Sequence, residues 1–191
     1  MITKININAT RVDTGERKLK LERVTMEMHR ILNSQLFRDK VIMMKPWGET
    51  SKWKGGNTVA IYNHIMSGAE ALSPEQDYEI DIYVDDYYSL KKVIGYTYKN
   101  TKYQYVNTRY FDKRQTDKIG ANILHEYGHK LGFGHDFRRT KRRPHSICYL
   151  LGDIYIECYR KLMGNLPQTV KVCRRSWKTL WLKKTCYWIE V

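Results

Sequence analysis

Apolar and polar positions recur along the chain with periods that predict both strands and helices. Residues 2–9 alternate apolar and polar side chains, which is the pattern of a half-buried strand. Residues 16–37 carry apolar side chains at helical spacing without an internal proline or glycine, so we expect one long helix there. The short apolar run at 41–44 predicts a strand that ends before Pro46.

The middle of the chain continues this mixture. A Gly-Gly pair predicts a loop at 51–57, and apolar spacing predicts a helix at 58–72 that is capped by its first residue, a threonine. Residues 78–83 alternate again, so we expect a strand there. Residues 93–98 and 102–110 are rich in β-branched and aromatic side chains, and we expect them to pair as antiparallel strands.

Two further helices are predicted in the second half of the chain. The first spans 116–131, with Thr116 or Asp117 as its N-cap and apolar side chains at helical spacing. The second spans 149–163, which is also apolar at helical spacing. We expect one α+β domain over 1–163, followed by a basic, Trp-rich extension over 164–191 that packs on the domain or mediates an interaction.

Composition excludes several classes of protein. The chain has 191 residues, of which 42% are hydrophobic, enough for one domain with a core. No apolar run approaches the roughly 20 residues of a membrane span. The first residues do not resemble a signal peptide, so synthesis in a reducing cytoplasm is expected. We expect the four cysteines to be mostly buried thiols, with one disulfide as the alternative: Cys148, Cys158, Cys173 and Cys186.

The net charge of +14 comes from 34 Lys and Arg against 20 Asp and Glu. One basic run spans 138–143, and a second lies between 171 and 184 among tryptophans. The plainest interpretation is a solvated loop and a basic surface helix. The alternatives are attraction of an acidic substrate or an anionic surface, and an interface in an assembly, where Trp and Arg are favoured. The sequence contains no recognition motif that would support nucleic-acid binding.

The segment 125–136 reads His-Glu-Tyr-Gly-His-Lys-Leu-Gly-Phe-Gly-His-Asp and carries the clearest chemistry. On a helix, His125 and His129 share one face about one turn apart, where two imidazoles can bind one zinc ion. Glu126 stands beside them, where its carboxylate can act as a general base. Gly132 permits a left-handed turn that ends the helix, so His135 can return as a third ligand.

This segment resembles the extended motif of the metzincin zinc endopeptidases, His-Glu-x-x-His-x-x-Gly-x-x-His, followed here by Asp136. The resemblance implies a twisted mixed sheet that packs on two or three helices, with the zinc-binding helix at a cleft. It also implies an antiparallel edge strand that pairs with extended substrate. The best match for that strand is Gly95, Tyr96, Thr97 and Tyr98, although an ordinary hairpin is equally consistent with these residues.

Metzincins also place a methionine-bearing turn beneath the zinc. Here the matching segment has Cys148 at the methionine position, and Met163 is the alternative farther along. The resemblance implies that Tyr149 approaches the zinc or stabilises an oxyanion, although its offset differs by one residue. Asp136 would fix the turn after His135 or orient a ligand. The combination of 95–98, the zinc motif and 142–146 is similar to small metzincin-like proteins encoded by bacteria and phages.

These residues predict a Zn²⁺-dependent endopeptidase that acts on a protein or peptide substrate, with Glu126 as general base. Two alternatives remain open. The zinc site can be kept for stability after loss of activity, although a purely structural zinc does not need Glu126. The chain can also be a virion-associated structural component, such as part of a phage tail or connector, with assembly partners bound through the basic C-terminal region.

Overall fold

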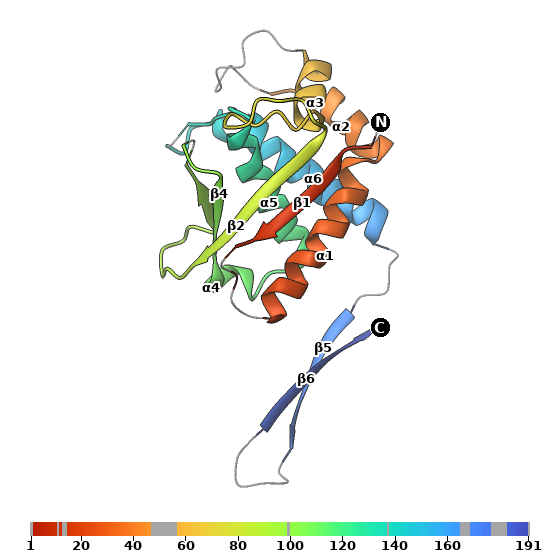
Figure 1. The fold of residues 1–191 in the computed structure, drawn as a ribbon, viewed down its shortest axis with the longest axis vertical. Helices are drawn as coiled ribbons and strands as arrows, with labels where there is room; N and C mark the ends of the chain where they lie inside the picture. The colour runs from red at the N-terminus through yellow and green to blue at the C-terminus, as the bar shows by residue number, and fades with distance from the viewer. Residues whose placement is uncertain are drawn as a thin grey trace.

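Four strands form a mixed open sheet, in which three run parallel and the fourth is an antiparallel edge (Figure 1). The computed structural model describes residues 2–10, 12, 15–46, 57–98, 100–136 and 138–164, together with the main chain of 169–176 and 183–190. The strands are β1 (Lys4–Ala9), β2 (Glu79–Tyr87), β3 (Gly95–Thr97) and β4 (Tyr103–Asn107), in the order β1-β2-β4-β3. β1 and β4 pair with β2 in parallel, and β3 pairs antiparallel with β4.

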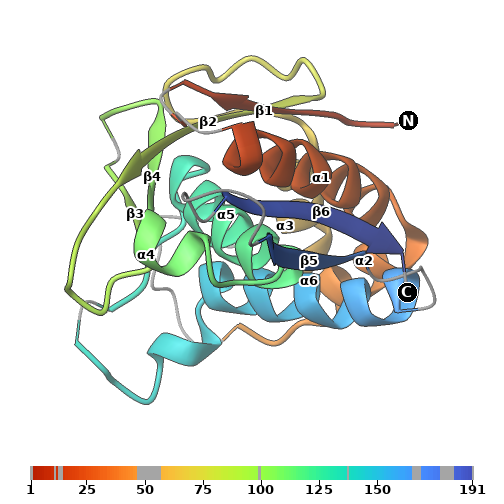
Figure 2. The same cartoon turned by 90° about the horizontal axis from the view of Figure 1, so that it is seen from below.

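Helices cover one face of this sheet. Figure 2 shows α1 and α5 beneath the strands, with α6 packed on α5. The predicted α+β class with an antiparallel edge strand is therefore present. The helices are α1 (Gly15–Leu32), α2 (Gln35–Met43), α3 (Thr58–Met66), α4 (Thr108–Phe111), α5 (Thr116–Lys130) and α6 (Ile147–Met163), with a short 3₁₀ turn η1 (Arg143–His145) before α6.

The core lies between the sheet and these helices because β2 alternates its side chains between two faces. Ile80, Ile82 and Val84 face the helices and are at most 1% exposed. From α5, Ile123 and Tyr127 enter the same core. The buried side of α5 thereby fixes the helix against the sheet, and the opposite side is free to carry the histidines.

The structure corrects the predicted helix at 16–37 and the predicted strand at 41–44. α1 ends at Leu32, and α2 begins after Ser34, whose side chain accepts a hydrogen bond from the Phe37 N–H. This N-cap restarts the helix and carries it through 41–43, with Val41 fully buried. A short apolar run cannot distinguish a buried strand from a buried helix by periodicity alone, which explains the error.

Two helix boundaries also differ from the predictions. α3 begins after Asn57, whose side chain accepts from the Ala60 N–H, and it ends at Met66, not near residue 72. Gly68 follows with φ +74°, a left-handed conformation that terminates the helix. α5 begins after Gln115, which makes no side-chain capping bond, so neither Thr116 nor Asp117 is its cap.

The C-terminal region contains β5 (Thr169–Ser176) and β6 (Lys183–Glu190), which pair as an antiparallel two-stranded sheet. The prediction of a basic surface helix is therefore wrong for residues 169–176 and 183–190, which form strands. The loop predicted at 51–57 lies outside the described residues except for Asn57. Cys148 and Cys158 are free and buried, as expected, whereas the side chains of the other two cysteines are not described. No helix in the described part of the chain is long and apolar enough to cross a membrane.

Candidate metal centre

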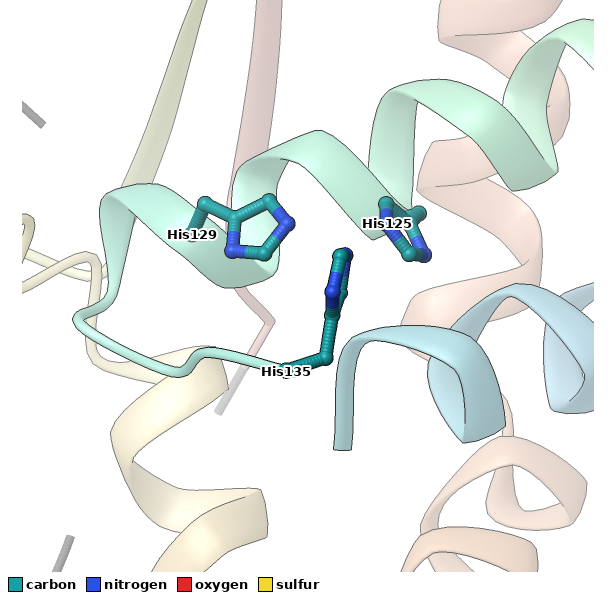
Figure 3. Close-up of side chains that lie close together, drawn as sticks. All are labelled: His125, His129 and His135. Carbon is teal, nitrogen blue, oxygen red and sulfur yellow. The ribbon is translucent and has the colours of Figure 1, made fainter. Parts of the chain in front are cut away.

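Three imidazoles converge at the C-terminal half of α5 (Figure 3). His125 and His129 project from the helix, and His135 faces them from the following loop. The ring centroids are 5.2 Å apart for His125 and His129, 5.3 Å for His125 and His135, and 4.8 Å for His129 and His135. One nitrogen from each ring lies within 4.8 Å of the others, so the group could hold one metal ion.

The turn after α5 brings His135 back toward the helix. Gly132 has φ +90°, the left-handed conformation that was predicted from the sequence. The main-chain N–H groups of Gly132 and Phe133 donate to the carbonyls of His129 and Gly128, which closes the helix end. Phe133 is fully buried beneath this turn. The loop is therefore fixed by hydrogen bonds and packing, and the third imidazole has a defined position.

Each ring uses one nitrogen for a main-chain carbonyl. The His129 Nδ1–H donates to the Phe133 carbonyl at 2.9 Å, and the His135 Nδ1–H donates to the Asp136 carbonyl at 3.1 Å. The His125 ring is hydrogen-bonded to the backbone of Cys148. Such bonds set the tautomer and orient the ring, which is the usual arrangement around metal-ligating histidines. One nitrogen of each ring lies within 4.8 Å of the others, so the oriented rings form a set of three potential ligands.

Two of the three histidines, His125 and His135, have lowered pKa values that favour the neutral imidazole. Burial, together with the neighbouring His129 and His135, lowers the pKa of His125 to about 3. Burial also lowers the pKa of His135. Neutral imidazoles offer lone pairs to a cation at pH 7, and three of them without a thiolate suit zinc and related divalent ions. A site with three protein ligands leaves a coordination position for water or substrate.

Glu126 is 6% exposed, and burial raises its pKa to about 7. The Asn122 side chain, one turn earlier on α5, makes a hydrogen bond to this carboxylate and favours its charged form. Lys130, one turn later, favours the charged form by its own charge. The sequence analysis missed Asn122, although its spacing of four residues from Glu126 is a signal for a contact on a helix.

Cys148 and Tyr149 approach the histidines from the start of α6. The Cys148 Sγ lies 3.6 Å from the His129 Nδ1, and Cys148 is fully buried. A Cβ on Gly128 would lie only 3.1 Å from that sulfur, so the glycine permits this close approach. Cys148 is the second residue of α6 and Met163 is the last. The rise of the helix therefore separates Met163 from Cys148 by about 20 Å along the helix axis. The structure thus places Cys148, not Met163, beside the imidazoles.

The Tyr149 ring lies against two of the imidazoles. Its centroid is 4.6 Å from that of His125 and 5.0 Å from that of His135. The Arg143 Nε donates to the Tyr149 Oη at 2.8 Å, so the phenol oxygen is held by a guanidinium. Sequence analysis gave no role to Arg143, because the contact depends on how η1 folds over α6.

Two of the predicted substrate-binding residues, Gly95 and Thr97, lie on β3 with their main-chain groups directed away from β4. The Asn107 N–H donates to the Ile94 carbonyl, so alternation along the antiparallel pair directs Ile94 and Tyr96 toward β4. Gly95 and Thr97 then direct their main-chain groups away from β4, to an edge where no strand of the described part of the chain pairs with them. Tyr98 follows the strand and is 60% exposed.

The end of β3 is fixed to α5. Lys130 is 6% exposed, and its Nζ donates to the carbonyls of Tyr98 and Thr101. Burial lowers the pKa of Lys130 to about 8. Asp136 directly follows His135, and its carboxylate accepts a hydrogen bond from the Thr140 hydroxyl. The bond ties Asp136 to Thr140, and the expected role of Asp136 in fixing the turn after His135 stays a prediction.

No protein-family model, no curated protein and no solved structure matches the chain.

Proposed function

We propose that the chain is a zinc-dependent endopeptidase of the metzincin type. The observation that carries this proposal is the convergence of three imidazoles, each with a main-chain partner, on a helix that also carries the buried carboxylate of Glu126. A purely structural zinc site has four protein ligands and needs no adjacent base, whereas a catalytic one has three. The order of the elements, with an antiparallel edge strand ahead of the histidine-bearing helix, is consistent with this class.

His125, His129 and His135 would hold the zinc ion, which supplies polarisation of the scissile carbonyl and acidification of water when bound. Glu126 accepts a proton from the attacking water and then passes it to the departing amine nitrogen. Asn122 keeps the Glu126 carboxylate in place during both transfers. The pKa of about 7 for Glu126 suits a group that must both accept and release a proton near neutral pH.

The substrate would bind as an extended peptide along β3. Gly95 and Thr97 offer main-chain donors and acceptors at that edge, which a peptide backbone can match as an added strand. Lys130 holds the carbonyls at the end of this strand, so the edge is rigid before substrate arrives. A rigid edge reduces the entropy lost on binding and aligns the scissile bond with Glu126.

The proposal is tested by zinc quantification and peptide-library digestion of the parent and a Glu126→Gln variant. We expect about one zinc per chain in both proteins and cleavage by the parent alone. Glu75→Gln is the matched control, because that carboxylate is exposed and outside the site. Equal cleavage by the parent and Glu126→Gln would refute the assigned base. Absence of zinc from both proteins would refute the metal site.

A second candidate is a structural component of a larger assembly, such as a phage tail or connector, that keeps the metal-binding site. The separate two-stranded sheet of β5 and β6, in the basic region of the chain, supports this candidate. It predicts zinc-loaded symmetric oligomers that do not cleave peptides. Light scattering together with the library digest separates the two candidates.

A further inference from the structure

A polar pocket lies between α2, α3 and the segment that leads into β2. Figure 1 shows α2 and α3 at the same end of the molecule as the N-terminus. The pocket has a volume of about 690 Å³, within the range of roughly 300–1,000 Å³ that is usual for small-molecule sites. Its lining includes Thr3, Arg38, Asn63, His64, Gln76 and Tyr78, and we call it the α2–α3 pocket.

The lining of the α2–α3 pocket carries a positive charge and no negative charge. Arg38 belongs to the lining, whereas no aspartate or glutamate does. Within the described part of the chain, no carboxylate forms an ion pair with the Arg38 guanidinium. The neighbouring carboxylates of Asp39 and Asp77 accept hydrogen bonds from the Gln35 Nε2 and the Glu79 N–H instead. The charge of Arg38 therefore remains for an anionic ligand to neutralise.

Arg38 is placed where a ligand can reach it. Its guanidinium lies over the Tyr62 ring, 6.0 Å from the ring centroid. A cation is attracted to an aromatic face, so this contact limits the positions of a long side chain. Arg38 is exposed, which leaves its N–H donors accessible. A guanidinium presents these donors in a planar fork that matches two oxygens of a carboxylate or a phosphate group.

Neutral donors stand beside this cation. The side-chain amides of Asn63 and Gln76 and the hydroxyl of Tyr78 belong to the same lining, and all three residues are exposed. None of the described residues forms a hydrogen bond with these side-chain groups. Amide N–H and phenol O–H groups can donate to an oxyanion. The pocket thus combines a fork-shaped cation with further donors that a ligand can use.

Tyr78 has an unusual backbone conformation at the wall of the pocket. Its φ is +59°, and among the described residues only glycines otherwise have a positive φ. Two main-chain hydrogen bonds fix it, since the Tyr78 N–H donates to the Ser67 carbonyl and the Lys4 N–H donates to the Tyr78 carbonyl. A bulky side chain is strained in this conformation, whereas glycine is not. Such strain is typical of residues at ligand-binding sites, which is consistent with a role for the Tyr78 side chain in the pocket.

We propose that the α2–α3 pocket binds a small organic molecule that carries a carboxylate or a phosphate group. The oxyanion accepts hydrogen bonds from the Arg38 guanidinium and from the amides of Asn63 and Gln76. The remainder of the ligand lies against the rings of Tyr62 and Tyr78, which are part of the lining.

The α2–α3 pocket adjoins the turn after α5 but is separate from the metal centre. The His64 Nε2–H donates to the Leu131 carbonyl at 3.0 Å, and its ring lies edge-on to Phe133 with centroids 5.7 Å apart. The lining contains neither Glu126 nor any of the three converging histidines. Binding is therefore expected in Glu126→Gln and in both zinc-loaded and metal-free protein, so a failure of this inference is distinguishable from a failure of the proposed function.

The test is an NMR titration of the full-length protein with two probes, succinate and glycerol phosphate. Succinate supplies carboxylate groups and glycerol phosphate supplies a phosphate group, so the two titrations distinguish the two sources of the oxyanion. With at least one probe, we expect saturable shifts of the Arg38 Nε signal and of the side-chain amide signals of Asn63 and Gln76. Sodium chloride at the same ionic strength should not reproduce these shifts.

Two substitutions at Arg38 test the contact. Arg38→Gln removes the charge, whereas Arg38→Lys keeps the charge but loses the planar fork. Because hydrogen bonds to charged groups are the stronger ones, we expect Arg38→Gln to weaken binding by about tenfold or more and Arg38→Lys to weaken it less. Arg160→Gln is the matched control, since Arg160 is an exposed arginine on α6 outside the lining. Thermal unfolding checks that each variant is folded.

Three outcomes would overturn the proposal. The first is equal affinity of Arg38→Gln and Arg160→Gln for both probes. The second is the absence of saturable shifts at Asn63 and Gln76 with either probe. The third is a set of shifts that is confined to the amides around the three histidines and disappears when zinc is removed, because the anion would then bind at the metal centre.

Discussion

The side chain of Asn122 occupies the space that a Cβ on Gly95 would need. A Cβ at Gly95 would lie 2.6 Å from the Asn122 Oδ1 and 2.9 Å from the Tyr105 carbonyl oxygen. Asn122 also bonds to the Glu126 carboxylate. The absence of a side chain at residue 95 thus lets β3 pack directly against the group that holds the proposed general base. The edge strand and the base are positioned by one amide.

Gly95→Ala should therefore damage activity more than stability. The added methyl group must displace either Asn122 or β3, and overpacking of this kind costs about 1–3 kcal/mol. A displacement near 1 Å can lower kcat/KM by on the order of 100-fold. Zinc content should be unchanged, because the atoms nearest to a Cβ at residue 95 belong to Asn122 and Tyr105 and not to a histidine. Peptide hydrolysis, metal analysis and urea unfolding provide the three measurements.

Gly15→Ala is the matched control for this substitution. Gly15 begins α1, and nothing lies within 4 Å of the position its Cβ would take. Alanine in a helix is favoured over glycine by roughly 0.5–1 kcal/mol, so this variant should be slightly more stable and equally active. Equal loss of activity in both variants would mean that residue 95 has no special role.

Asn122→Ala tests the amide directly. A hydrogen bond to a charged group is worth about 1.5–3 kcal/mol, so we expect kcat to fall by roughly 10- to 100-fold with zinc retained. The bond lowers the pKa of Glu126, and its loss should raise that pKa. Because the base must be deprotonated to act, the acid limb of the kcat/KM profile should move to higher pH. An unmoved limb would show that Asn122 does not act through Glu126.

The convergence of the three histidines was predictable because their geometry is local. His125 and His129 are related by one turn of helix, and the turn at Gly132 needs only a residue that tolerates positive φ. The eleven residues from His125 to His135 therefore contain almost all the information about where three imidazoles lie. The antiparallel pairing of β3 with β4 was predictable for the same reason, since few residues separate the strands.

Other features depend on contacts between distant segments. The parallel pairing of β1 with β2 joins residues about 75 positions apart, and the two hydrogen bonds between Asn33 and Thr3 exist only once α1 packs beside β1. The bond from Arg143 to Tyr149 likewise requires η1 to fold back on α6. The misassigned strand at 41–44 has a related cause, because tertiary burial and the cap at Ser34 decided its conformation.

Tyr149→Phe separates a catalytic phenol from a packing ring. The variant keeps the ring against His125 and His135 but removes the oxygen that Arg143 holds. If that oxygen stabilises the transition state, kcat should fall by about 10- to 100-fold while KM and zinc content hold. An unchanged kcat with a lowered melting temperature would instead assign Tyr149 to structure alone.

Glu70→Gln should change how stability depends on pH. Glu70 accepts a hydrogen bond from the Tyr127 Oη at 2.8 Å, and burial raises the pKa of Glu70 above its ordinary value of 4.5. At pH values between the pKa of Glu70 in the unfolded chain and its higher pKa in the folded protein, the folded state binds more protons than the unfolded state. The free energy of unfolding therefore falls as pH rises through this range. Glutamine keeps an acceptor for Tyr127 but cannot ionise. Urea unfolding should therefore show that the free energy of unfolding of the variant increases relative to that of the parent as pH rises from 4.5 toward neutral. A difference in free energy of unfolding that is constant with pH would contradict the assignment.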